Sequence, residues 1–202
     1  MEKIDFKKQL AHLYKPSAKQ CQWVDVPAMN FIMIDGHGDP NTSPQFTAAI
    51  EALYPVAYTL KFTLKNEHGY DYGVLPLEGL WWADDMDDFL RGNKSNWDWT
   101  LMIMQPDIIT PDMVRMAVDK VKAKNNPPAI DQLRFESYAE GKSAQIMHIG
   151  PYSEEAENIS KLHEFIATAG LERRGKHHEI YLSDMRRTAP EKLKTIIRQP
   201  AG

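Results

Sequence analysis

The chain has 202 residues and a mass of 23.2 kDa, a length that allows one large domain or two small ones. Its 43% hydrophobic and 26% charged residues are ordinary globular usage, which excludes fibrous and disordered classes. Twenty-four Lys and Arg against 28 Asp and Glu give a net charge of −4, which argues against a nucleic-acid partner that needs a basic face.

The sequence indicates neither a membrane-spanning helix nor a secretory signal. No stretch approaches the roughly 20 apolar residues of a membrane-spanning helix, so no membrane partner is expected. The first ten residues, MEKIDFKKQL, lack the apolar core of a secretory signal. The single cysteine, Cys21, cannot form an intrachain disulfide and fits a reducing compartment. The sequence therefore predicts a cytoplasmic protein.

Apolar spacing predicts the elements of the first half of the chain. In chain order they are a helix over Asp5–Tyr14, a strand over Phe31–Asp35, a helix over Gln45–Leu60, and strands over Leu75–Ala83 and Trp97–Gln105. Pro55 lies inside the second helix and should kink or divide it. The acidic run Asp84–Asp88 is expected to form a solvated turn.

Apolar spacing also predicts the elements of the second half of the chain. In chain order we expect a helix over Pro111–Lys124, strands over Leu133–Tyr138 and Ala144–Ile149, a helix over Glu154–Ala169, and strands over Glu179–Ser183 and Thr195–Arg198. Residues Ala139–Lys142 are predicted to be a hairpin turn between their flanking strands. Ser153 is the expected N-cap of the last helix, and Glu155 is one of the acids that suit its first turn.

One order of elements occurs twice. The strand FIMID, a helix, and the strands PLEGLWW and TLMIMQP are matched by QIMHI, a helix, HEIYL and KTIIRQP. This repeat predicts an α+β protein of two strand–helix–strand–strand units, related by a pseudo-twofold axis, with a ligand cleft between them. We interpret residues 1–202 as one domain, with a first repeat over about 28–107, a connecting helix and hairpin over 108–143, and a second repeat over about 144–202.

Two glutamates occupy equivalent places in the repeats. Strand alternation puts Glu78 on the same face as Trp82, and Glu179 on the same face as Tyr181. A carboxylate beside aromatic rings is costly to bury unless it is paired or protonated. It can therefore be a pocket group with a raised pKa, which acts as a base or meets a cationic ligand. A glutamate that faces solvent, or that pairs with Lys or Arg, is the alternative.

Aromatic residues are concentrated in the first half, where four of the five tryptophans lie between Trp81 and Trp99. If their strand faces line one cleft, Trp82 and Trp99 form a flat aromatic slot. Met33, on a neighbouring strand, suits a permissive site because methionine adapts to irregular apolar shapes. Core packing of each of these residues is the alternative.

Several other chemistries find no support in the sequence. The histidines show neither HExxH nor Cys/His ligand spacing, so no metal is expected. GHGDP lacks the GKS/T ending of a phosphate loop, and no GxSxG nucleophile is present. Cys21 has no activating neighbour and is expected to be a bystander. No cofactor is predicted.

The segments SAQIMHIGPYSEE and HHEIYLSDMRRTAPEKLKTIIRQP resemble the GyrI-like small-molecule-binding domain. FIMIDGHGDPN, PLEGLWW and WDWTLMIMQPD resemble its stand-alone branch, and the resemblance covers roughly residues 20–202. It implies a duplicated strand–helix–strand–strand fold and a pocket for flat, hydrophobic, often cationic compounds. It also implies that Glu179, in HEIYL, contacts the ligand. Some stand-alone members hydrolyse the cyclopropane of DNA-alkylating natural products related to yatakemycin and CC-1065.

Three functions follow as hypotheses. In the first, a cyclopropanoid hydrolase with a detoxifying role, Glu179 assisted by Glu78 deprotonates a water that opens the strained ring. The residues expected to hold the planar substrate are Trp82, Trp99, Tyr152, Met33 and Tyr181. In the second, the same slot sequesters amphipathic cations without converting them. In the third, the aromatic cluster is only a core or an interface of an interaction protein. A monomer is expected, because the repeat supplies internally what a dimer supplies between chains.

Overall fold

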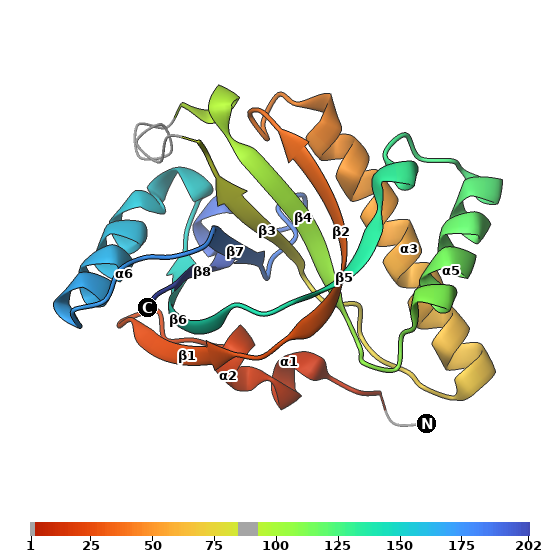
Figure 1. The fold of residues 1–202 in the computed structure, drawn as a ribbon, viewed down its shortest axis with the longest axis horizontal. Coiled ribbons are helices and arrows are strands. Elements are labelled where there is room, and N and C mark those ends of the chain that lie inside the picture. The colour runs from red at the N-terminus through yellow and green to blue at the C-terminus, as the bar shows by residue number, and fades with distance from the viewer. Residues whose placement is uncertain (1–2, 85–92) are drawn as a thin grey trace. The chain divides into compact units, whose positions relative to one another are not determined.

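The computed structural model describes residues 3–84 and 93–202, which form an α+β fold with antiparallel strand pairs (Figure 1). Its helices are α1 (Phe6–Gln9), α2 (Ala11–Tyr14), α3 (Pro44–His68), α5 (Pro111–Lys124) and α6 (Ala156–Thr168). Its strands are β1 (Gln22–Val26), β2 (Met29–His37), β3 (Leu77–Trp82), β4 (Asp98–Gln105), β5 (Arg134–Tyr138), β6 (Gly141–Ile149), β7 (His177–Tyr181) and β8 (Lys194–Pro200). The expected fold class is confirmed.

Contacts divide the chain into two compact units. Unit 1 comprises Met1–Phe6, Met29–Leu75 and Trp81–Tyr138, and unit 2 comprises Lys7–Ala28, Pro76–Leu80 and Ala139–Gly202. Strand β3 therefore begins in unit 2 and ends in unit 1.

Two sets of four strands repeat one order, which confirms the duplication. Strands β3, β4, β2 and β5 are neighbours in that order in the sheet, and β7, β8, β6 and β1 follow the same order. Helix α3 lies between β2 and β3 in sequence, as α6 lies between β6 and β7. The cleft and the pseudo-twofold axis stay predictions.

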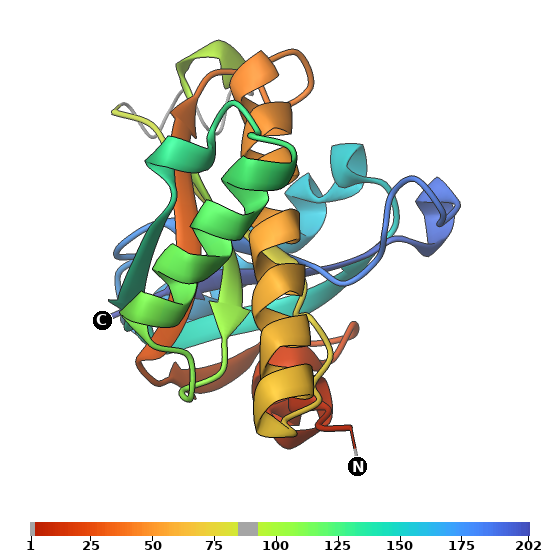
Figure 2. The same ribbon diagram turned by 90° about the vertical axis from the view of Figure 1, so that its right-hand side faces the viewer.

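Of the two expected effects of Pro55, a kink or a division, the division does not occur, because α3 is one helix that continues through Pro55. On both sides of Pro55, buried side chains that include Leu53, Val56 and Leu60 hold the helix in place. The hydroxyl of Thr59 donates to the Pro55 carbonyl at 2.8 Å. Tertiary burial thus outweighs the backbone hydrogen bond that proline removes. Figures 1 and 2 show α3 and α5 side by side in unit 1.

Several local expectations were wrong. The predicted helix Asp5–Tyr14 is two short helices, α1 and α2, because Leu10 between them departs from helical angles. Helix α6 has Glu155 rather than Ser153 at its N-cap. The strands flanking 139–140 do not form a hairpin with each other, because β5 pairs with β2 whereas β6 pairs with β1 and β8. Strand β1 was not predicted. Most of the expected acidic turn, from Asp85 on, lies outside the described residues.

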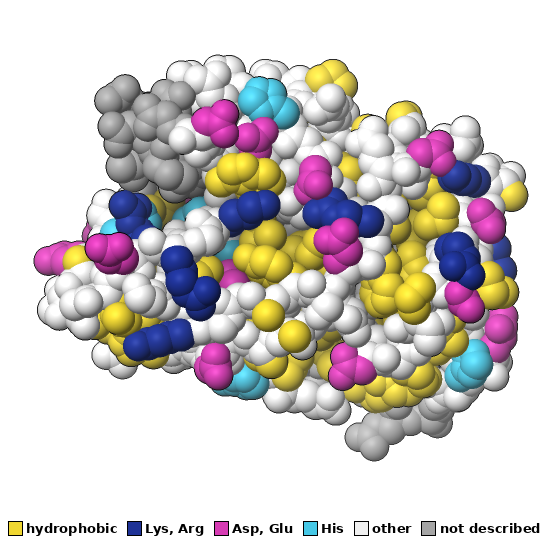
Figure 3. Space-filling model, viewed as in Figure 1, with side chains coloured by type: hydrophobic (Ala, Val, Ile, Leu, Met, Phe, Trp, Pro, Cys, Tyr) yellow, Lys and Arg dark blue, Asp and Glu magenta, His cyan; other side chains and the backbone are white. Residues whose placement is uncertain are grey.

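Positive and negative side chains are interspersed on the face drawn in Figure 3. None of the helices in residues 3–84 and 93–202 has the length and apolarity that crossing a bilayer requires.

Gly36 illustrates how tightly unit 1 is packed. It lies opposite Trp99 in the β2–β4 pair, and the Trp99 ring crosses the position that a side chain would occupy. A Cβ atom at Gly36 would lie 2.1 Å from the nearest ring atom of Trp99, which is completely buried. We expect Gly36→Ala to lower the free energy of unfolding by roughly 1–3 kcal/mol, the usual effect of overpacking. Urea denaturation measures it. Gly73→Ala, whose Cβ would lie 3.6 Å from its nearest neighbour, is the control. Equal unfolding free energies for the two variants would contradict this packing.

Candidate functional site

Strand β7 separates two polar clusters in unit 2. Glu179 lies opposite Ile197 of β8, which packs against α6, so the Glu179 side chain lies on the α6 side of the strand. His178 lies opposite Arg198 and points to the other side. The alternation of His177, Glu179 and Tyr181 against His178, predicted from sequence, is present.

Glu179 is held by its own strand. Its Oε1 atom lies 3.1 Å from Nε2 of His177, and its Oε2 atom accepts a hydrogen bond of 2.7 Å from the Tyr181 hydroxyl. The His177 side chain is 1% exposed, whereas the Glu179 side chain is 14% exposed. The carboxylate is thus fixed at two points, and part of the Glu179 side chain is exposed.

The pKa of Glu179 is lower than the ordinary value, whereas the sequence led us to expect a raised one. Burial acts to raise this pKa, but hydrogen bonding and charge from His177, together with the Tyr181 hydrogen bond, outweigh burial. Glu179 is therefore ionised at neutral pH and available as a proton acceptor.

Tyr152 supplies an aromatic wall beside this carboxylate. Its ring lies edge-on to that of Tyr181, with centroids 5.8 Å apart at 82°. The turn that precedes it depends on Gly150, whose φ of 142° favours glycine. Nε2 of His148 donates to the Pro151 carbonyl at 3.1 Å, which anchors this turn to β6. The structure therefore brings together three predicted site residues: Glu179, Tyr181 and Tyr152.

A second carboxyl group, that of Glu155, completes this cluster. Glu155 is the N-cap of α6, is 5% exposed and acts with His177 and Tyr181 to lower the pKa of Glu179. From sequence we assigned it only to the helix dipole, and we did not single out His177. A glutamate in a first helical turn is common, so no spacing signal could have paired Glu155 with Glu179.

Glu78 belongs to the cluster on the opposite side of β7. Its Oε1 accepts a hydrogen bond of 2.8 Å from the Tyr14 hydroxyl, and its Oε2 lies 2.9 Å from Nε2 of His178. Burial and the nearby Glu78 carboxylate hold the pKa of Tyr14 well above its usual value, so the phenol remains a donor. Glu78 is completely buried, and the structure does not place it beside Glu179.

The opposite cluster continues through charged side chains. Nδ1 of His178 lies 3.0 Å from both oxygens of Glu140, and Nη1 of Arg198 donates to Glu140 at 3.2 Å. The guanidinium also donates to Oε1 of Gln145, at 3.1 and 3.0 Å. We call Tyr14, Glu78, His178, Glu140, Arg198 and Gln145 the buried network.

Charge within the buried network balances. Burial disfavours the charged imidazole of His178, but Glu140 and Glu78 outweigh it and raise the pKa of His178 to about 9. Burial likewise acts against ionised Glu140, yet His178 and Arg198 lower its pKa to about 2. Two carboxylates thus face an imidazolium and a guanidinium. Glu78 is thus a buried, paired group, but its partners are Tyr14 and His178 rather than the Lys or Arg considered from sequence.

The remaining predicted site residues lie in unit 1. Trp99 is completely buried, with its ring edge-on to Phe46 at 5.2 Å, and Met33 is 3% exposed. Both have core positions, the alternative considered from sequence. Trp82 is partly exposed at the end of β3.

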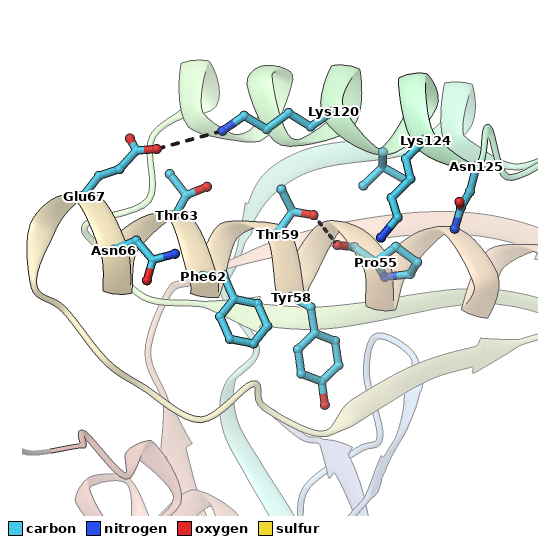
Figure 4. A pocket seen from close by; sticks show the side chains of 11 residues that line it. Pro55, Tyr58, Thr59, Phe62, Thr63, Asn66, Glu67, Lys120, Lys124 and Asn125 are labelled. Atoms are coloured by element: carbon cyan, nitrogen blue, oxygen red, sulfur yellow. Dashed lines mark hydrogen bonds and ion pairs between the residues drawn. The ribbon is translucent and has the colours of Figure 1, made fainter.

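A hollow of about 500 Å³ lies between α3 and α5 of unit 1 (Figure 4). Figure 4 shows Lys120 and Lys124 on one helix, and Tyr58 and Phe62 on the other. Its lining contains no predicted site residue. Among the described residues, no group of three or more His, Cys, Asp or Glu side chains is arranged to hold a metal ion.

A family model for the GyrI-like small-molecule-binding domain matches residues 19–201. The chain belongs to the GyrI-like family. This confirms the resemblance seen in the sequence and assigns small-molecule binding as the general property of the domain. No curated protein sequence matches the chain significantly.

Solved structures from Listeria innocua match this GyrI-like chain along nearly its whole length. An uncharacterised conserved protein is 38% identical with a TM-score of 0.89, covering 98% of this chain and 100% of its own. A protein described as a hydrolase is 37% identical with a TM-score of 0.86 and the same coverage. A hydrolase encoded by lin2189 is 36% identical with a TM-score of 0.87, and both chains are covered completely.

Proposed function

We propose that this GyrI-like protein binds flat, hydrophobic small molecules beside Glu179 and hydrolyses them by means of a water that Glu179 activates. The observation that carries the proposal is the half-buried Glu179 carboxylate, oriented by His177 and Tyr181 and flanked by the Tyr152 ring. Two similar proteins are described as hydrolases, which supports a hydrolytic reaction.

The proposed substrates carry a cyclopropane conjugated to a dienone carbonyl, as in DNA-alkylating natural products. The oxygen of water bonds to the cyclopropane CH₂ carbon, and the bond from this carbon to the ring breaks. Its electron pair moves to the carbonyl oxygen, which takes up a proton and becomes a phenol. Glu179 accepts the proton that water loses. The product has gained one water, and its former cyclopropane CH₂ carbon now carries a hydroxyl group and no longer alkylates DNA, so the reaction detoxifies the compound.

In this proposal each residue has a role in the step. Tyr181 and His177 fix the carboxylate, and the rings of Tyr152 and Tyr181 pack against a planar substrate. Because Glu179 is ionised at neutral pH, it needs no prior deprotonation. General base catalysis of this kind contributes about 10²–10⁴-fold to a rate.

A duocarmycin-type cyclopropane compound tests the proposal. Incubation with the protein should bleach the dienone absorbance, and mass spectrometry should show the gain of one water. Unchanged substrate whose binding quenches tryptophan fluorescence would instead indicate the second candidate, capture without conversion. The ionised Glu179, which accepts a hydrogen bond from Tyr181, favours a cationic ligand for that role. Unchanged substrate with no sign of binding would contradict both candidates.

The variant Tyr181→Phe tests whether the Tyr181 hydroxyl holds the Glu179 carboxylate and lowers its pKa. Removal of the hydroxyl deletes a hydrogen bond that lowers the Glu179 pKa, so this pKa should rise. Activity that requires ionised Glu179 is lost as pH falls through this pKa. The acid limb of the pH–rate profile should therefore move to higher pH in Tyr181→Phe, with a lower maximal rate. An acid limb at the wild-type position would show that this hydrogen bond does not act on the base.

A further inference from the structure

The hollow of about 500 Å³ between α3 and α5 of unit 1 shares no residue with the cluster around Glu179 or with the buried network (Figure 4). Concave sites of roughly 300–1,000 Å³ hold small organic ligands in many proteins. The lining of this hollow combines aromatic rings, hydroxyl groups, amide groups and two lysines. Such a mixture suits a ligand that has an apolar body and a polar end.

Two aromatic rings of α3 form one wall of the hollow. Tyr58 and Phe62 lie one helical turn apart, with ring centroids separated by 6.3 Å and ring planes inclined by only 25°. Each of these side chains is 49% exposed. Removal of such apolar surface from water is favourable, and aromatic rings also attract one another when they stack with an offset or meet edge-on. The wall therefore suits a ligand that contains an aromatic ring system.

The lysines of α5 differ in how their charge is balanced. Nζ of Lys120 lies 4.0 Å from Oε1 of Glu67, which also lines the hollow. Lys124 follows one helical turn later, and Figure 4 shows its side chain reaching from α5 toward α3. No acidic side chain in residues 3–84 and 93–202 forms an ion pair with Lys124. The lining thus holds one positive charge that no carboxylate balances.

The charge of the lining selects the class of ligand. A carboxylate accepts hydrogen bonds from an ammonium group, and Asn125, which also lines the hollow, has an amide that can donate a further one. Glu67 repels additional negative charge at its own end of the hollow. A ligand with a single negative charge therefore fits better than a strongly acidic peptide.

We propose that this hollow is a second ligand site of the protein, which binds small aromatic carboxylates. The aromatic rings of the ligand pack against Tyr58 and Phe62, and its carboxylate accepts a hydrogen bond from the Lys124 ammonium group. This site takes no part in the reaction proposed for Glu179.

The probes 2-naphthoate and 2-naphthamide share one ring system and differ in charge. Each is titrated into ¹⁵N-labelled full-length protein, and backbone amide NMR shifts locate the bound probe and give its affinity. We expect saturable shifts within residues 58–67 and 120–125. The carboxylate should bind about two- to fivefold more tightly than the amide, which corresponds to the usual contribution of an exposed ion pair.

Variants of exposed side chains separate the two parts of the site. Lys124→Gln should lower the affinity for 2-naphthoate to that for 2-naphthamide. Lys122→Gln is the matched control, because Lys122 pairs with Asp131 and does not line the hollow. It removes the same charge from the same helix and should keep the preference for the carboxylate. Phe62→Ala should weaken both probes alike, by about two- to tenfold.

Three results would overturn the proposal. One is the absence of saturable shifts in the hollow, or shifts confined to residues 177–181. Another is equal affinity of the wild-type protein for the two probes. The third is an equal loss of preference in Lys122→Gln and Lys124→Gln, which would assign the preference to the general charge of α5. Ring opening of a cyclopropane substrate is measured separately, so each of these results can occur while the proposed hydrolysis stands.

Discussion

Replacing Glu179 by Gln should reduce the rate of cyclopropane opening by about 10²–10⁴-fold, the usual contribution of a general base. Glutamine has nearly the same shape, and its amide oxygen can still accept the Tyr181 hydrogen bond. It cannot take a proton from water. Binding of a neutral planar substrate should therefore change little, because shape and apolar contact determine it.

Single-turnover kinetics at saturating substrate separate this loss from any effect on binding. The matched control is Glu164→Gln, which removes an exposed carboxylate from α6 of the same unit and should retain the wild-type rate. A Glu179→Gln protein that opens the ring at the wild-type rate would remove Glu179 from the mechanism. Equal loss of binding and rate would instead give this side chain a role in holding the ligand.

Disruption of the buried network should have the largest effect on stability. Glu140 is 2% exposed and faces both His178 and Arg198. Glu140→Gln leaves two buried cations with one carboxylate, and breaking a buried pair in this way costs about 3–5 kcal/mol. Urea denaturation should show this loss. Glu157→Gln, which removes the exposed partner of Lys161 on α6, should leave the denaturation midpoint nearly unchanged. A Glu140→Gln midpoint equal to that of wild type would show that the network does not hold unit 2 together.

The same network predicts how stability depends on pH. The lowered pKa of Glu140 gives stability that is present above its ordinary pKa of 4.5 and is lost as pH falls toward about 2. The raised pKa of His178 gives stability that is complete below 6.5 and is lost as pH rises through about 9. The contribution of the network should therefore be greatest between pH 4.5 and 6.5. In Glu140→Gln the alkaline loss should shrink, because His178 keeps only Glu78. An alkaline loss of unchanged size would contradict the assigned pairing.

Sequence periodicity predicted the features that depend on local pattern. The repeated order of elements is present in both units, and the alternation along HHEIY places Glu179 and Tyr181 on one side and His178 on the other. Tyr152 reaches this site because the Gly150 turn follows β6 directly.

The predictions that were wrong concern features that depend on long-range contacts. Glu78 looked equivalent to Glu179, but its partners Tyr14 and His178 lie 64 and 100 residues away in sequence. The register of one strand against another determines this pairing, and no single strand encodes it. Trp99 looked like a ligand-stacking residue until the β2–β4 pairing placed it over Gly36. The effect of Glu155 on the pKa of Glu179 was overlooked because it depends on how α6 packs, which helical spacing does not reveal.

We expect Glu179 to activate water rather than to attack the cyclopropane itself. A single turnover in H₂¹⁸O, with the product and the Glu179 peptide analysed by mass spectrometry, separates the two mechanisms. If Glu179 is a base, the new hydroxyl of the product carries the heavy oxygen and the Glu179 peptide stays unlabelled. A product with ordinary oxygen and a labelled Glu179 peptide would mean that the carboxylate forms an ester with the substrate, which contradicts the role of Glu179 as a base.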